Sequence, residues 1–169
     1  LNNNIGGAFS PYVLIESGEF TSVQHADFNG DGIDDLIALG LNPARIQTLL
    51  GTTGGGFSAT QTIAWRGTGP SYLTVGDIDG DGDQDAVFWE DAAAGEVVIL
   101  INDGSGTVAL GPSTGIFANR PFTASLADLD GDLDLDLCIP FLGDDLLSIW
   151  LNDGTGSFVH SADYPSGDG

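Results

Sequence analysis

The sequence is poor in basic residues: three Lys and Arg residues stand against 25 Asp and Glu residues, for a formal net charge of −22. Binding to nucleic acid requires a basic surface that neutralises phosphates, so this shortage excludes nucleic acid as a partner. It also disfavours attachment to an anionic membrane surface, since like charges repel. The same acidity favours solubility in water that is rich in salt or calcium.

Sulfur is equally scarce, because the chain has no Met and a single cysteine, Cys138. One cysteine cannot form an intrachain disulfide. It stands in the apolar run Leu137-Cys138-Ile139, which predicts a small buried hydrophobic side chain rather than a nucleophile.

Long apolar runs are absent as well, so we expect no segment to insert into a membrane. No signal-peptide pattern is present and residue 1 is Leu, which indicates a processed mature protein or a piece of a longer one. Hydrophobic residues still make up 41% of the 169 residues, enough for a packed core. The 26 Gly residues indicate many tight turns.

Aspartate is abundant, and it is gathered in three nine-residue loops that begin 50 and then 51 residues apart. Fourteen of the acidic residues lie in these loops, which are residues 27–35, 77–85 and 128–136. So many carboxylates repel one another unless a hard cation lies among them. Ca²⁺ suits them better than Mg²⁺, because it accepts six to eight oxygen ligands in flexible geometry. We therefore expect about three Ca²⁺ ions, one in each loop.

The candidate ligands stand at positions 1, 3, 5 and 9 of each loop, and the backbone carbonyl at position 7 is a further donor. We expect the side chains of Asp34 and Asp134 to be solvated or to lie behind the direct ligands. The candidate sets are Asp27, Asn29, Asp31, Ile33 and Asp35 in the first loop, Asp77, Asp79, Asp81, Asp83 and Asp85 in the second, and Asp128, Asp130, Asp132, Asp134 and Asp136 in the third.

Position 6 distinguishes the third loop from the other two. Gly32 and Gly82 occupy it in the first two loops, where glycine permits a left-handed turn. Leu133 replaces them in the third loop, and a left-handed leucine costs about 1–2 kcal/mol. We therefore expect the third site to be the weakest or the most distorted.

Two other interpretations of the loops are weaker. An EF-hand needs Glu at position 12 and flanking helices, but position 12 is Ala38, Phe88 or Ile139, and the flanks resemble strands. Acidic turns without a metal are the simplest alternative. The recurrence of one oxygen pattern in three loops argues against it.

Aligning the loops reveals a repeat of about 50 residues. Short apolar segments, rich in β-branched residues and separated by turn residues, recur at the same places around each loop, which predicts four strands per repeat. The expected strands are residues 22–26, 36–39, 46–50 and 57–63 in the first repeat, 72–76, 86–89, 97–101 and 107–110 in the second, and 123–127, 137–139, 147–151 and 157–160 in the third.

The first residues of the chain repeat the end of this unit. Residues 1–9 match residues 151–158, so we expect an outer strand near residues 9–15. The predicted fold is all-β, with tandem four-stranded antiparallel β-propeller blades: three full blades plus an extra N-terminal strand. The expected division is an outer strand of a preceding or neighbouring blade at 1–18, blades at 19–66, 67–118 and 119–165, and a tail or linker at 166–169.

The loops, their spacing and the Gly-turn-Phe element resemble FG-GAP or VCBS-type repeats over nearly the whole chain. Such repeats build the calcium-bearing β-propellers of integrin α-subunits, of some lectins and of many secreted bacterial proteins. The resemblance implies a cation loop between the first and second strands of each blade. It also implies closed rings, commonly of seven blades. Three blades cannot close such a ring.

Motifs for catalysis are not found in the sequence. His25 and His160 have no Ser or Cys partner at a recognisable spacing, and we expect strand-end or packing roles for them. Trp89 and Trp150 fall within strand segments and are expected in the core. The chain is therefore predicted not to be an enzyme.

These features together predict a calcium-binding structural or adhesion module, secreted or at the cell surface, because resting cytosolic Ca²⁺ is too low for weak loops. Expected partners are further propeller blades or other copies of the chain, joined head to tail into a filament or by strand donation from residues 9–15, besides glycans or cell-surface proteins. Two alternatives stay open: a carbohydrate-binding propeller, with Trp65 beside Arg66 as the sugar contact, and a non-catalytic domain of a secreted enzyme.

Overall fold

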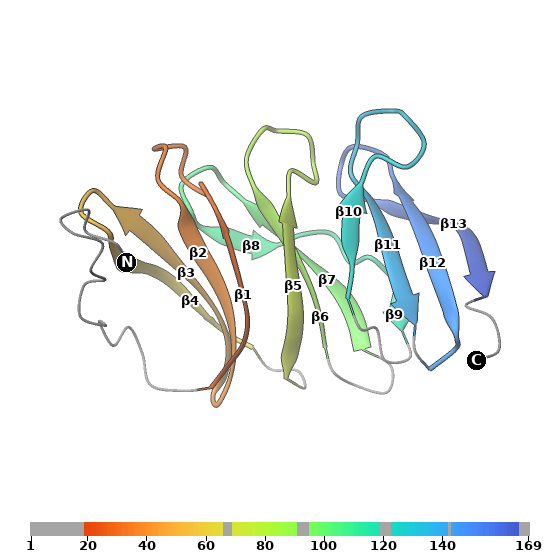
Figure 1. Cartoon of the computed structure of the whole chain (residues 1–169), viewed down its shortest axis with the longest axis horizontal. Coiled ribbons are helices and arrows are strands. Elements are labelled where there is room, and N and C mark those ends of the chain that lie inside the picture. The colour runs from red at the N-terminus through yellow and green to blue at the C-terminus, as the bar shows by residue number, and fades with distance from the viewer. Residues whose placement is uncertain (1–18, 66–68, 91–94, 119–122, 142, 166–169) are drawn as a thin grey trace, which may run out of the picture.

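The computed structural model describes residues 19–65, 69–90, 95–118, 123–141 and 143–165. Within these ranges the chain forms thirteen strands and no helix, in three antiparallel sheets that stand in a row (Figure 1). The predicted all-β fold of four-stranded units is confirmed. The row is open, and its described part closes into neither a barrel nor a propeller ring. The strand expected near residues 9–15 and the tail at 166–169 lie outside the described residues.

Four strands of each sheet follow the order of the chain, so that neighbours in the sheet are consecutive, and only β9 departs from this order by pairing with β7. The first sheet contains β1 (Phe20–Ala26), β2 (Asp35–Leu41), β3 (Ala44–Thr52) and β4 (Gly56–Ala64). The second contains β5 (Pro70–Gly76), β6 (Asp85–Glu90), β7 (Gly95–Asn102), β8 (Val108–Leu110) and the short β9 (Phe117–Ala118). The third contains β10 (Ser125–Ala127), β11 (Asp136–Phe141), β12 (Leu146–Asn152) and β13 (Phe158–Pro165).

All twelve strands expected from the repeat are present, and β9 was not expected. β8 pairs with only the last residues of β7, from Leu100 to Asn102. The first residues of β7, Gly95 and Glu96, therefore keep a free edge, and β9 pairs with them. A strand of two residues carries too little hydrophobic periodicity to be recognised from sequence.

The second sheet has both faces buried. Along β6, Ala86 and Phe88 pack toward the first sheet, whereas Val87 and Trp89 pack toward the third. This alternation is the two-residue period of a strand, and all four side chains are at most 1% exposed. The described residues therefore form two cores, one on each side of the second sheet.

Each core joins the faces of two neighbouring sheets. Phe28, Ile37, Leu39 and Ile46 of the first repeat meet the second sheet in one core. In the other, Ile78, Val97 and Ile99 of the second repeat meet Leu137, Ile139 and Phe141 of the third. The prediction that Trp89 lies in the core is confirmed, and Trp150 packs against the second core while partly exposed.

Side-chain amides tie neighbouring sheets together. Asn102 at the end of β7 donates from Nδ2 to the carbonyl of Phe28 at 2.7 Å, and Asn152 at the end of β12 donates in the same way to Ile78 at 2.8 Å. Gln61 of β4 both donates to the carbonyl of Val108 and accepts from its N–H. These bonds fix the offset between sheets, which apolar packing alone leaves free to slide.

We expect the substitution Asn102→Ala to destabilise the protein by about 1–3 kcal/mol, because it leaves the buried carbonyl of Phe28 without a donor. Chemical unfolding followed by tryptophan fluorescence would measure this. Ser58→Ala is the matched control, since Ser58 is exposed on β4, and it should change the stability by less than about 0.5 kcal/mol. Equal stability of the two variants would contradict the proposed tie.

Candidate metal centres

The three aspartate loops lie at the same edge of the row of sheets, which is the upper edge in Figure 1. Each connects the first strand of its sheet to the second, as the sequence predicted: β1 to β2, β5 to β6 and β10 to β11. Position 9 is the first residue of the second strand in every repeat, namely Asp35, Asp85 and Asp136. The loops are therefore equivalent in the fold as well as in sequence.

The position-9 carboxylate is fully buried in all three repeats. Asp85 accepts the N–H of Ile78 at 2.9 Å through Oδ2 and the N–H of Asn102 at 2.8 Å through Oδ1. Asp35 and Asp136 accept the same pair of bonds, from Phe28 and Gly51 and from Leu129 and Asn152. One side chain thus joins the loop to the end of the third strand.

Position 1 holds the loop closed. Asp77 accepts the N–H of Gly82 at 3.0 Å, and Asp27 and Asp128 accept the corresponding N–H at 2.7 and 3.2 Å. The position-5 carboxylate accepts the N–H of position 7, for example from Asp83 to Asp81 at 2.9 Å. The turns present their side-chain oxygens on the inner side of a tight loop.

Three carboxylates gather in the second and third loops. Oxygen atoms of Asp77, Asp79 and Asp85 all lie within 4.8 Å of one another, and so do those of Asp128, Asp130 and Asp136. Two oxygens bound to one Ca²⁺ at the usual distance are separated by at most about 5 Å. The donor atoms are all hard oxygens, so the residues present fit a calcium ion.

In the second and third loops the structure brings together the carboxylates of positions 1, 3 and 9, and not that of position 5. Asp81 and Asp132 do not belong to the two carboxylate clusters. In the first loop position 3 is Asn29, whose amide oxygen takes the place of a carboxylate and accepts the N–H of Asp31 at 3.0 Å. The backbone position-7 ligands predicted at Ile33, Asp83 and Asp134 stay predictions.

Crowding of carboxylates changes their acidity. Burial raises the pKa of Asp85 from 3.8 to about 6, opposed by its two backbone hydrogen bonds and supported by the negative charges of Asp79 and Asp81. The pKa of Asp79 is raised by the same two causes, burial and neighbouring carboxylates, and that of Asp130 is raised chiefly by lost hydration. A bound cation would remove these penalties.

The third loop contains the backbone feature that its sequence predicted. Leu133 has φ +82°, close to the values of +82° and +96° at Gly32 and Gly82. Its side chain is 87% exposed, so no packing compensates for the left-handed conformation. The expected weakness of the third site itself stays a prediction.

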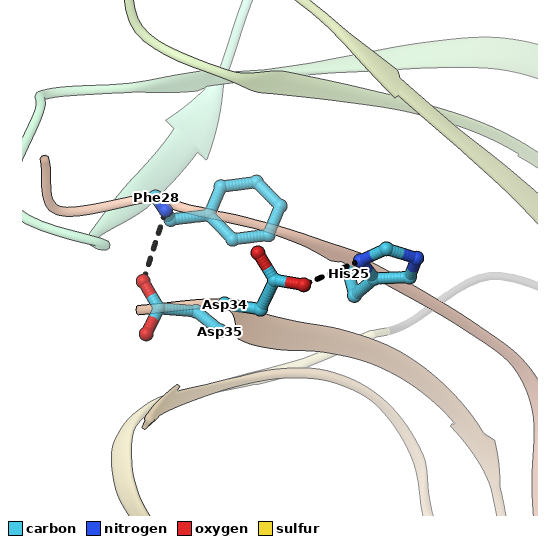
Figure 2. A network of polar contacts seen from close by, with 4 residues as sticks. All are labelled: His25, Phe28, Asp34 and Asp35. Atoms are coloured by element: carbon cyan, nitrogen blue, oxygen red, sulfur yellow. Dashed lines mark hydrogen bonds and ion pairs between the residues drawn. The ribbon is translucent and has the colours of Figure 1, made fainter. Parts of the chain in front are cut away.

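His25 and Asp34 form a pair outside the ligand sets. His25 Nδ1 lies 3.1 Å from Oδ2 of Asp34, and both side chains are exposed. Figure 2 shows Asp34 turned toward His25, while the neighbouring Asp35 turns toward the N–H of Phe28. The strand-end position predicted for His25 is confirmed, since His25 is the penultimate residue of β1.

Two further predictions concern single residues. Cys138 is half-buried rather than buried, and burial raises the pKa of its thiol. Trp65 donates its indole N–H to Glu90 at 2.7 Å and meets the ring of Phe88 edge-on. Its predicted partner Arg66 lies outside the described residues.

Sequence reasoning missed the second role of position 9 and the role of the turn asparagines. It treated Asp35, Asp85 and Asp136 as ligands alone, although each also joins two strands. It did not single out Asn102 and Asn152, although their amides cross to the preceding sheet. Their recurrence 17 and 16 residues after the position-9 aspartate was the available signal.

The chain matches a known family of repeats. A family model described as an FG-GAP-like repeat matches residues 27–88 and 77–139, so that each match begins at one aspartate loop and runs past the next. Among curated proteins, no significant match is found. No helix among the described residues has the length and apolarity needed to cross a membrane.

We expect calcium binding to the second loop to weaken as the pH falls through about 6, because protons compete for Asp85. Calorimetric titration near pH 6 in two buffers of different ionisation enthalpy would detect the released proton. The folding stability of the calcium-free protein depends on pH in the opposite direction. The raised pKa of Asp85 stabilises the fold below about pH 4, and this contribution is lost as the pH rises through about 6. Binding without proton release would contradict this assignment.

We expect Leu133→Gly to stabilise the calcium-loaded protein by about 0.5–1 kcal/mol, because relief of the left-handed leucine exceeds the entropy cost of glycine. The reciprocal substitution Gly82→Leu should destabilise it by about 1–2 kcal/mol. Thermal unfolding of both variants beside the wild type would check this. Changes of the same sign in both variants would show that position 6 does not control loop strain.

Proposed function

Because this chain belongs to the FG-GAP-like repeat family, we propose that it is a calcium-binding structural module of an extracellular protein. Repeats of this family occur in extracellular adhesion-type modules. The proposal assigns one Ca²⁺ to each loop and assigns no catalytic step to the chain. The family is a structural, non-catalytic kind of repeat.

The observation that carries the proposal is the carboxylate cluster around a buried position-9 aspartate. Asp77 and Asp79 face the fully buried Asp85 across distances that one Ca²⁺ would bridge, and the third loop repeats this arrangement. Few cations are available to neutralise them within the chain, which has only three Lys and Arg residues. A divalent cation is therefore the partner that this chemistry favours.

Calcium would contribute to stability rather than to chemistry. When bound, it supplies two positive charges among carboxylates that otherwise repel one another. The chain's own contribution is orientation: two backbone N–H groups hold Asp85 in place, and the N–H of Gly82 holds Asp77. The backbone carbonyls of Phe28 and Ile78, which belong to the first and second loops, accept the inter-sheet bonds from Asn102 and Asn152. Metal binding to these loops would therefore also stiffen the contact between repeats.

We further propose that the three sheets are blades of a β-propeller. Each contains four strands in chain order, with β9 added to the second sheet, and the first strands β1, β5 and β10 lie next to one another along the row (Figure 1). Further blades or other copies of the chain would be needed to close a ring. A secreted or cell-surface location follows, since loops of modest affinity fill only where calcium is plentiful.

We expect the native chain to bind about three Ca²⁺ ions and each filled site to stabilise it, by about 2.7 kcal/mol at a calcium concentration one hundred times the dissociation constant. Asp79→Ala should remove about one ion, with little effect on the calcium-free fold, because the backbone N–H of Asp81 meets its carboxylate at a long 3.3 Å. Calorimetric titration and thermal unfolding with and without chelator would measure both. The control is Asp144→Asn, an exposed acidic residue outside the loops.

The decisive result is the comparison of chelated and calcium-loaded protein. An unfolding temperature that does not change in millimolar calcium would reject the proposed function. Equal stabilisation by Mg²⁺ would keep a cation-dependent module but remove its calcium selectivity.

A further inference from the structure

A turn of each later repeat fits into the preceding sheet. Asn102 donates to the carbonyl of Phe28, and Asn152 donates to that of Ile78. Phe28 and Ile78 are the position-2 residues of their loops, and each is only 1% exposed. The turn of one repeat therefore covers the loop of the repeat before it, twice in this chain.

The glycine four residues after each asparagine completes the fit. A Cβ at Gly106 would lie 2.5 Å from Cδ2 of Leu50, and one at Gly156 would lie 3.6 Å from Cγ2 of Ile78. Both glycines have a positive φ, +80° and +76°. The docking element is thus an Asn-x-x-x-Gly turn, whose amide reaches a carbonyl while its glycine approaches apolar side chains.

The third sheet has the equivalent surface for an Asn-x-x-x-Gly turn, but no such turn of the described residues lies on it. Its position-2 residue, Leu129, is 46% exposed. Leu129, Ile149 and Leu151 line a shallow hollow of about 300 Å³, together with residues of β13. These three residues correspond in the repeat to Ile78, Ile99 and Ile101, which meet the turn and sheet of the next repeat. Among the described residues, both Asn-x-x-x-Gly turns are already used.

The chain contains one more segment with this pattern, at its amino-terminal side. Residues 1–9 present the spacing twice, as Asn2 with Gly6 and Asn3 with Gly7. Asn2 precedes the first aspartate of the next loop by 25 residues, and Asn102 precedes it by 26. The turn of the first repeat has Gly51 at this position instead, so it has no side-chain amide to donate.

We propose that the hollow on the third sheet binds the segment of residues 1–9 from a second copy of the chain. The amide of Asn2 or Asn3 would donate to the carbonyl of Leu129, and the following glycine would approach Ile149 and Leu151. The first and third sheets lie at opposite ends of the row (Figure 1), which favours a second copy over the same chain. This proposal rests on the proposed role as a structural repeat module.

Charge adds a condition to this docking. Two copies with a formal charge of −22 each repel one another. Calcium in the loops, which border the hollow through Asp130, would reduce that repulsion, as would salt. Association is therefore expected to strengthen in calcium and to weaken after chelation at low ionic strength.

Sedimentation velocity of the full chain in millimolar calcium, over a wide range of concentration, tests the proposal. The wild type should self-associate. Leu129→Lys blocks the hollow, and the double substitution Asn2→Ala, Asn3→Ala blocks the turn. Each should weaken self-association by about tenfold or more, since a buried carbonyl loses its donor or the hollow gains a charge. Val159→Lys is the matched control, because Val159 is 69% exposed on β13 and does not line the hollow.

Mixing the two blocked variants gives the sharpest result. One retains the hollow and the other retains the turn, so an equimolar mixture should form a one-to-one dimer that neither forms alone. A mixture that stays monomeric, a monomeric wild type, or full self-association of either variant would overturn the proposal. Calcium-dependent unfolding temperatures from the same samples separate this failure from a failure of the proposed function, which requires only calcium stabilisation.

Discussion

The buried position-9 aspartate is the interaction on which the rest of the structure depends. It removes a carboxylate from water, which is costly unless hydrogen bonds compensate, and in each repeat two backbone N–H groups do so. Those two N–H groups belong to the loop and to the end of the third strand. The loop shape, the position of its second carbonyl and the start of the second strand are therefore set by one side chain.

The loop geometry in turn determines how sheets join. Because position 9 fixes the loop against the third strand, the position-2 carbonyl stands where the asparagine of the next repeat can reach it. Asp85 thereby takes part both in a carboxylate cluster and, through the N–H of Asn102, in the segment that clasps the first sheet. A cation bound at this cluster would therefore stabilise the inter-repeat contact directly, through Asp85 and Asn102, without any change in the sheets themselves.

The strands could be predicted from sequence because their signal is local. Alternating apolar residues and turn residues recur in three aligned copies, and Gly32 and Gly82 even revealed the left-handed backbone of Leu133. The inter-sheet bonds of Asn102 and Asn152 could not be predicted, because each asparagine lies 74 residues from the residue whose carbonyl it reaches. Cys138 was predicted to be buried but is half-buried, because an apolar run does not reveal how short the first strand of this sheet is, with only Ser125, Leu126 and Ala127 paired to β11.

The two ends of such an array of repeats are not equivalent, because inner sheets are covered on both faces and the last sheet is not. Both faces of the second sheet are covered because a repeat stands on each side, and the two cores arise from that alone. The turn of a later repeat covers the aspartate loop of the repeat before it. The aspartate loop of that later repeat is covered only when a further repeat follows. If a repeat is added, it covers the hollow around Leu129 but exposes an equivalent hollow on its own sheet. Only ring closure, a capping segment or another chain can bury that surface, and the acidic loop beside it makes calcium a natural condition for doing so.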